Sequence, residues 1–373
     1  MKSKNFWIVL AMILSLTVAS CTPQAPQRAA QTTVERVVET VIVEQRVEVP
    51  VTEIVEVEVE STPVPLTKID VCFSAASGTM VTAWYAFEND LFEKYGLDVN
   101  LTYIGSGSKA ATAMIAGDVE FCQIAGSAVT SSVVAGSDLV MIGGLFNTFV
   151  YSLMVTPVIQ SPEDLIGKAV AISRAGSSSD TAIRAALDDL GLVPDEQVAV
   201  LAVGGQAERL AAMESGAVVG TVVSVPETVE AKELGFVELL DMSTSKTPFQ
   251  HTGIATTRPY IEQNRETVVN FMKAIVEAIA FMKRDKEGTM QVMAEYLLLD
   301  VEDDAPSLTE AYDVLILGYL PTTPYPSVDG VETVLNGLVE ENPDAANFTG
   351  EDVADTSIVQ ELEDSGFIDE VNQ

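Results

Sequence analysis

The sequence predicts an α/β fold with two lobes, each a mainly parallel sheet flanked by helices and joined to the other by a hinge. From Leu66 onward, strand signals alternate with helix signals, which is typical of parallel sheets covered by helices on both faces. This alternation starts again after residues 151–155. A short motif also recurs, because residues 113–119 (AMIAGDV) are similar to residues 212–218 (AMESGAV). In both copies a helix ends at glycine and leads into a buried strand, so two similar lobes are favoured over one continuous sheet.

The individual elements follow from apolar periodicity, with short apolar runs read as strands and longer amphipathic segments as helices. In the first set the expected strands are 69–73, 99–103, 121–124 and 139–146, and the expected helices are 81–94, 110–116 and 128–135. In the second set the expected strands are 169–172, 198–203 and 221–223, and the expected helices are 181–190, 206–215 and 227–234.

The region after Phe249 is expected to be mostly helical and to return to the first lobe. An amphipathic helix near residues 265–285 carries its apolar side chains on one face. The chain is expected to cross between the lobes near residues 155–160 and 243–252. The predicted organisation is a signal peptide at 1–20, a tether at 21–65, a first lobe made of 66–157 and 250–373, and a second lobe at 158–249.

The N-terminus has the layout of an export signal. Lys2 and Lys4 precede an uncharged run from Asn5 to Leu16, and small residues lead to Cys21. The apolar run is too short for a spanning helix, which needs roughly 20 residues. The order aliphatic, small, small, Cys resembles the bacterial lipobox, so Cys21 is expected to be acylated and to anchor the chain to a membrane, with an incidental cysteine beside an ordinary cleavage site as the alternative.

Residues 22–65 are expected to form an extended, self-repelling tether. They contain no glycine, and valines and glutamates nearly alternate from Val34 to Glu60. The glutamates oppose pairing with another strand. A flexible chain of this length spans roughly 35 to 40 Å. A short hairpin or helix is the alternative.

Two cysteines, Cys72 and Cys122, remain after Cys21. Both lie in apolar runs that are expected to be strands, which favours buried free thiols. A bond between neighbouring strands is the alternative.

The charge balance excludes nucleic-acid binding. The chain has 20 Lys and Arg against 55 Asp and Glu, a formal net charge of −35, and such a surface repels nucleic acids and anionic membranes. An anionic ligand would therefore need locally arranged hydrogen-bond donors.

Glycine and serine follow almost every expected strand, at the edge where open α/β sheets bind ligands. They occur within the loops 74–78, 105–108, 125–127, 174–179, 204–205 and 224–226. Free N–H groups at the following helix starts favour a polar or anionic group, although serine and glycine are also ordinary cap residues. Lys109 and Arg174 add positive charge. We expect Arg174 and the serines up to Ser179 to bind an anionic group, whereas Asp180 would favour a neutral or zwitterionic one.

Three segments resemble the ABC-transporter binding proteins for nitrate, sulfonates, taurine and thiamine-precursor pyrimidines. They are residues 84–99, 165–173 and 204–216, within a resemblance that covers about residues 68–285. The resemblance implies a periplasmic-binding-protein fold (type II-like) that closes on a ligand by a hinge motion. Carried over by position, it implies that ligand is bound by Ser74, Ser77, Trp84, Gly107, Ser108, Gly126, Ser127, Ser177, Ser178, Ser179 and Asp180.

The function expected from these observations is capture of a small polar or anionic organic solute and its delivery to an ABC permease and ATPase. No cofactor, metal or catalytic residue is expected, and the chain is expected to be a monomer. A pyrimidine-making enzyme is disfavoured, because the single histidine, His251, has no clustered cysteines or acid-base partners beside it. A sensory module for a surface receptor remains an alternative, since closure around a ligand also serves as a signal.

Overall fold

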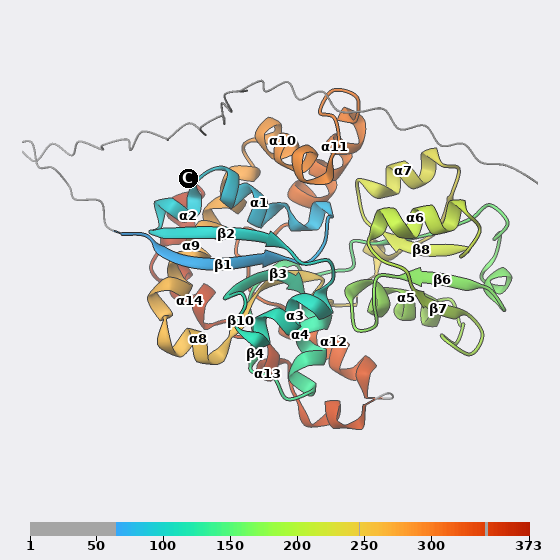
Figure 1. Cartoon of the computed structure of the whole chain (residues 1–373), viewed down its shortest axis with the longest axis horizontal. Coiled ribbons are helices and arrows are strands. Elements are labelled where there is room, and N and C mark those ends of the chain that lie inside the picture. The colour runs from blue at the N-terminus through green and yellow to red at the C-terminus, as the bar shows by residue number, and fades with distance from the viewer. Residues whose placement is uncertain (1–64, 246, 340–341) are drawn as a thin grey trace, which may run out of the picture. The chain divides into compact units, whose positions relative to one another are not determined.

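The computed structural model describes residues 65–245, 247–339 and 342–373. This part of the chain holds two five-stranded sheets with helices on their faces (Figure 1). The expected signal peptide, Cys21 and nearly all of the tether lie outside the described residues. Within the described ranges, no helix is both long enough and apolar enough to cross a membrane.

The first sheet has the strand order β2-β1-β3-β10-β4. β1 pairs in parallel with β2 and β3, whereas β10 runs antiparallel to β3 and β4. Four strands therefore share one direction, and their carboxyl ends lie at one edge. The strands are β1 (Thr67–Phe73), β2 (Leu97–Tyr103), β3 (Phe121–Ala125), β4 (Leu139–Phe146) and β10 (Thr252–Thr257).

The second sheet repeats this plan in the order β7-β6-β8-β5-β9. β6 pairs in parallel with β7 and β8, and β5 runs antiparallel to β8 and β9. Both sheets are thus mainly parallel with one reversed strand. The strands are β5 (Ser152–Val155), β6 (Ala169–Ile172), β7 (Ala199–Ala202), β8 (Gly220–Val223) and β9 (Val237–Asp241).

The reversed strand of each sheet comes from chain that has just left the other sheet. β5 follows β4, and β10 follows β9. The first crossing is therefore residues 147–151, earlier than the expected 155–160, because β5 pairs with β8 and β9 and belongs to the second sheet. The second crossing, between Asp241 and Thr252, overlaps the expected one, but β10 is a strand that the expected helical region did not include.

Alternating side chains bury both faces of the first sheet. Val71 and Phe73 of β1 pack in one cluster and Cys72 in another, as the two-residue period of a strand requires. One cluster includes helices α1 (Val81–Glu88), α2 (Leu91–Lys94) and α9 (Arg265–Met282). The other includes α3 (Gly107–Ala116), α4 (Gly126–Val134) and α12 (Val328–Leu338). The expected helix 81–94 is divided at Asp90, whose φ of 56° is left-handed.

The second sheet is covered in the same way, and the C-terminal region packs on the first sheet as expected. Helix α5 (Ser178–Asp189) covers one face of the second sheet, and α6 (Gln206–Glu214) and α7 (Glu227–Glu233) cover the other (Figure 1). The remaining helices are α8 (Arg258–Gln263), α10 (Lys286–Leu297), α11 (Ala305–Ala311), α13 (Gly350–Val353), α14 (Ser357–Asp364) and α15 (Phe367–Val371).

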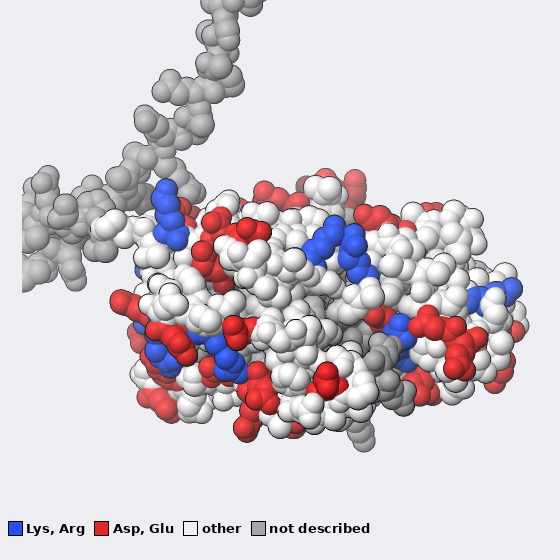
Figure 2. All heavy atoms as spheres, turned by 60° about the horizontal axis from the view of Figure 1, so that its bottom comes forward, with Lys and Arg blue, Asp and Glu red and all other residues white. Residues whose placement is uncertain are grey.

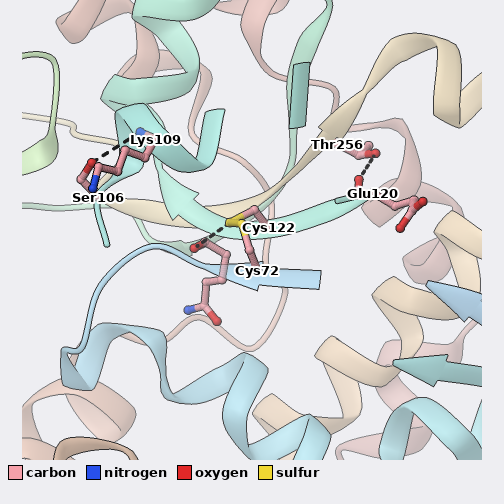
Figure 3. The surroundings of a disulfide bond; sticks show 7 residues. Cys72, Ser106, Lys109, Glu120, Cys122 and Thr256 are labelled. Carbon is pink, nitrogen blue, oxygen red and sulfur yellow. Dashed lines mark hydrogen bonds between the residues drawn. A yellow bond between two sulfur atoms is a disulfide. The ribbon is translucent and has the colours of Figure 1, made fainter. Parts of the chain in front are cut away.

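Cys72 and Cys122 form a disulfide, so the favoured prediction of free thiols was wrong (Figure 3). The two residues are register partners on the parallel strands β1 and β3, with Cα atoms 4.4 Å apart. Both are fully buried. The sequence did not reveal this pairing because it depends on which strands are neighbours, and 50 residues separate the two cysteines.

Candidate functional site

A cleft of about 770 Å³ lies between the two sheets. Loops that leave the carboxyl ends of the strands form much of its wall, as expected for open α/β sheets. Ser74, which follows β1, and Gly105, which follows β2, line it from the first lobe. Ser173, which follows β6, and Gly205, which follows β7, line it from the second. A volume of this size suits a small organic molecule.

The first-lobe wall combines a capped turn with an aromatic ring. The Ser77 hydroxyl accepts a hydrogen bond from the Thr79 backbone N–H, which starts the turn that leads into α1. Tyr103 lies at the end of β2 and is half exposed, and its ring stacks on Phe73 with the ring centroids 5.3 Å apart. Gly107 also lines the cleft, and an added Cβ there would lie 2.8 Å from the Ala128 Cβ. This position therefore requires glycine.

The start of α5 supplies three cleft-lining serines. Ser177 caps the helix by accepting from the Asp180 backbone N–H, and the Ser179 hydroxyl accepts from the Ser173 N–H at 2.9 Å. The Ser178 hydroxyl lies 2.8 Å from the Tyr151 hydroxyl, which comes from the first crossing segment. The serines are thus held by hydrogen bonds within the second lobe and, at Ser178, with the first crossing segment.

Two hydrogen bonds join the lobes beside the cleft. The hydroxyls of Ser77 and Ser224 lie 3.1 Å apart, and the Ser108 hydroxyl donates to the Ala175 carbonyl at 2.9 Å. Ser108 is therefore a contact between the lobes. Arg174, which precedes Ala175, is exposed, and its side chain lies outside the cleft lining.

A buried polar group that the sequence reasoning did not select lies on the second-lobe wall. The Arg209 guanidinium donates to the Thr221 hydroxyl and to the carbonyls of Gly204 and Val222, at 2.8 to 2.9 Å. Burial lowers its pKa. Glu227 lies on the same wall, and burial raises the pKa of its carboxyl to about 8.

The sequence pattern that could have indicated the buried Arg209 is the segment Gly204 to Arg209, in which a Gly-Gly turn starts a helix. Gln206 in this segment accepts from the Ser224 backbone N–H at 2.7 Å and so ties α6 to the end of β8. The segment contributed to the family resemblance, but its side chains were not assigned to the site.

His251 lies on the second crossing segment and lines the cleft. It is 1% exposed, and its ring centroid is 4.5 Å from that of Tyr151. Burial lowers its pKa to about 3, so the imidazole is neutral at physiological pH. Among the described residues, its Nδ1 atom has no hydrogen-bond partner.

Several residues expected to bind ligand lie outside the cleft lining. Trp84 is fully buried and stacks on Tyr296, with ring centroids 4.8 Å apart. Gly126 and Ser127 start α4, and an added Cβ at Gly126 would clash with Gln250. Asp180 accepts from the Gly176 N–H and pairs with Arg184 at 2.9 Å. Of the expected site residues, the cleft brings together Ser74, Ser77, Gly107, Ser177, Ser178 and Ser179.

In the described part of the chain, no three His, Cys, Asp or Glu side chains are close enough to share a metal ion. The geometry is that of a cleft between two lobes whose wall carries both polar and apolar groups.

Several solved structures share this fold. The nitrate-binding protein NrtA from Synechocystis PCC 6803 matches with a TM-score of 0.68 and 14% identity, covering 80% of this chain and 89% of that one. The alkanesulfonate-binding protein SsuA from Xanthomonas axonopodis pv. citri, bound to MOPS, matches with a TM-score of 0.63 and 15% identity, covering 74% and 94%. These likenesses establish the periplasmic-binding-protein fold.

Sequence comparison agrees with the structural one. A binding protein from Brucella abortus (strain 2308) is 27% identical over 227 residues, which cover 60% of this chain and 69% of the Brucella protein. This relative and the two structural neighbours are all named as binding proteins. The model of the family described as NMT1/THI5-like matches residues 79–288. Because this match spans more than half of the chain, the protein belongs to the NMT1/THI5-like family.

Proposed function

We propose that the chain is the extracytoplasmic solute-binding lipoprotein of an ABC importer, which captures a small polar organic solute between its two lobes. The observation that carries this proposal is the cleft of about 770 Å³ at the carboxyl ends of the strands. Two crossing segments link the walls of this cleft, so one lobe can rotate toward the other around them. Membership of the family supports a binding role.

The partners follow from this role. The neighbours with the same fold include a ligand-binding component of an ABC-type import system from Staphylococcus aureus. By analogy with that component, we propose that this chain delivers its solute to a permease and ATPase. Acylation of Cys21 and the charged tether up to residue 65 would hold the protein near the permease, outside the cytoplasmic membrane. A monomer is sufficient, because the lobes of one chain form the cleft.

The lobes are assigned from strand pairing. The first lobe comprises residues 66–146 and 252–373, and the second comprises residues 152–241. The crossing segments 147–151 and 242–251 form the hinge. They contain Tyr151 and His251, whose rings contact each other beside the cleft.

Thermal unfolding with candidate solutes tests the proposal. The Cys21→Ala chain, produced without a lipid, is screened against sulfonates, nitrate, amines, pyrimidines, flavins and aromatic acids. A solute that binds only the native state stabilises it by about 2.7 kcal/mol at 100 times its Kd. We therefore expect at least one solute to raise Tm by several degrees.

A matched pair of variants locates the binding. Ala76 is exposed and lines the cleft, whereas Ala135 is exposed at the end of α4 and lies outside its lining. Ala76→Trp should abolish the Tm shift by filling the cleft, and Ala135→Trp should preserve it. A shift that survives Ala76→Trp would place the bound solute elsewhere and contradict the proposal.

A further inference from the structure

The cleft wall carries an unequal charge. Its described lining contains six acidic residues, of which Glu227 is protonated at neutral pH because burial raises its pKa to about 8, and one basic residue, Arg209. The six are Glu208, Glu227, Glu230, Glu233, Asp303 and Asp304. Acidic side chains are also spread widely over the face shown in Figure 2. A concave wall of one sign attracts counter-ions and raises the local concentration of an oppositely charged solute.

Arg209 does little to offset this charge. Its side chain is 2% exposed, and three of its N–H groups already donate to oxygen atoms of the protein. A guanidinium has five N–H donors, and burial of most of its surface restricts the approach of a solute to the remaining two. Lys109 and Arg174, which were expected to supply positive charge, lie outside the cleft lining.

The carboxylates come from both lobes and act on each other across the cleft. Burial raises the pKa of Glu230 on α7, and the charge of Asp304, which precedes α11 in the first lobe, raises it further together with Glu214 and Glu233. Glu208 on α6 likewise raises the pKa of Tyr103 at the end of β2, after the larger effect of burial. Closure of the lobes would strengthen these repulsions, so a positive charge between the walls would stabilise the closed form.

Two further groups suit a positively charged nitrogen. His251 lines the cleft, and its imidazole is neutral at physiological pH, so it adds no positive charge that would oppose a cation. Tyr103 is 50% exposed and lines the cleft. Its ring face can attract a cation by a cation–π contact.

We propose that the captured solute is an organic cation, with an ammonium, amidinium or guanidinium nitrogen held between the carboxylates of the two lobes. This inference rests on the proposed solute-binding function and names the class of solute. A metal ion fits less well, because no three His, Cys, Asp or Glu side chains within the described ranges are near enough to one another to share it. An organic cation needs only dispersed carboxylates, an aromatic face and hydrogen-bond acceptors.

Calorimetry on the Cys21→Ala chain tests whether the solute must carry a positive charge, by comparing the binding of matched charged and neutral probes. Choline is compared with its neutral isostere 3,3-dimethyl-1-butanol, 1,5-diaminopentane with 1,5-pentanediol, and both pairs with ethanesulfonate and nitrate. We expect binding by at least one cation and at least tenfold weaker binding by its neutral counterpart. Binding of neutral or anionic probes without any cation would overturn the inference and leave the solute-binding function standing. If none of the probes binds, the cation class is likewise rejected, while the wider screen still tests the function.

A charge-neutral variant then locates the effect. Glu208→Gln with Glu230→Gln removes two exposed cleft carboxylates. Exposed charge contacts are individually weak, so we expect the loss of both to make the cation bind about fivefold more weakly. The control, Glu262→Gln with Glu310→Gln, removes the same charge from exposed positions outside the cleft lining and should change Kd less than twofold. Equal effects of the two double variants would show that only the overall charge matters and would overturn the assignment.

Discussion

The cleft depends on serine and glycine residues that start helices directly after strands. Local sequence rules place such residues well, because a cap needs only the N–H groups two or three positions ahead. Ser77 and Ser177 illustrate this, since each caps the turn that follows it and lines the cleft. Ser108 has the same local pattern but contacts the other lobe at Ala175. The role of Ser108 is determined by residues that are distant in the sequence, and not by its own segment.

Glu227 provides a test at the residue scale. Its pKa is raised from 4.5 to about 8, mainly by burial and also by the charge of Glu230, against the opposing effects of a backbone hydrogen bond, Arg209 and Gln206. Between these pH values the native state holds a proton that the unfolded state has lost, so the free energy of unfolding falls as pH rises from about 4.5 through 8. Glu227→Gln mimics the protonated form. We expect its free energy of unfolding to be close to that of the wild type at pH 5 and to exceed it by about 4 kcal/mol at pH 9.

Urea unfolding at pH 5, 7 and 9 measures this difference. Glu310→Gln, at an exposed position on α11, is the control and should follow the wild-type pH dependence. If Glu227→Gln and the wild type differ by the same amount at all three pH values, the carboxyl is not protonated in the native state.

At the scale of elements, the sequence predicted most strands and helices but not their pairing. Periodicity is local, so the segments around β1, β3, α5 and α9 agree with the structure within a few residues. The reversed strand β10 was missed, because Thr252–Thr257 is a strand only by pairing with β3 and β4. For the same reason the disulfide was not the favoured prediction and the hydrogen bonds of Arg209 were not predicted, since each joins elements that only the folded sheet brings together.

The disulfide gives a test at this scale. Cys72 and Cys122 tie β1 to β3 across 50 residues of chain, and the loop-entropy description assigns such a link about 4 kcal/mol of stability. In the Cys21→Ala background, replacing both cysteines with alanine should lower the free energy of unfolding by about 2 to 4 kcal/mol. Both residues lie outside the cleft lining, so solute affinity should stay within twofold.

Thiol counting provides the independent check of that link. The urea-denatured, non-reduced Cys21→Ala chain should show no free thiol, and two should appear after reduction. Two reactive thiols before reduction would contradict the disulfide between β1 and β3.

At the scale of the whole molecule, the two lobes are built on one plan, and after each crossing the chain enters a sheet as its reversed strand. β5 starts the second sheet, whose strands all come from one continuous segment, whereas β10 returns to complete the first sheet, which is therefore discontinuous. The crossing segments therefore belong to the folded core as well as to the hinge. Phe149 and Phe249, one from each crossing, stack with ring centroids 3.9 Å apart. This contact favours rotation of one lobe against the other over their separation.

The last prediction concerns how the whole chain is held at the membrane. Acylation of Cys21 would add several acyl chains at one end, which anchors a protein durably, whereas one chain alone binds only marginally. Cys21→Ala removes the acylated thiol, and we expect the protein to move from the membrane fraction to the soluble fraction while its solute-dependent Tm shift stays unchanged. Ser20→Ala keeps a small residue before the cysteine and should leave the protein membrane-bound. Fractionation followed by immunoblotting measures both variants, and mass spectrometry of the N-terminal peptide detects the acyl groups. A Cys21→Ala chain that stays in the membrane fraction would show that something other than this cysteine, such as an uncleaved N-terminal helix, holds the protein there.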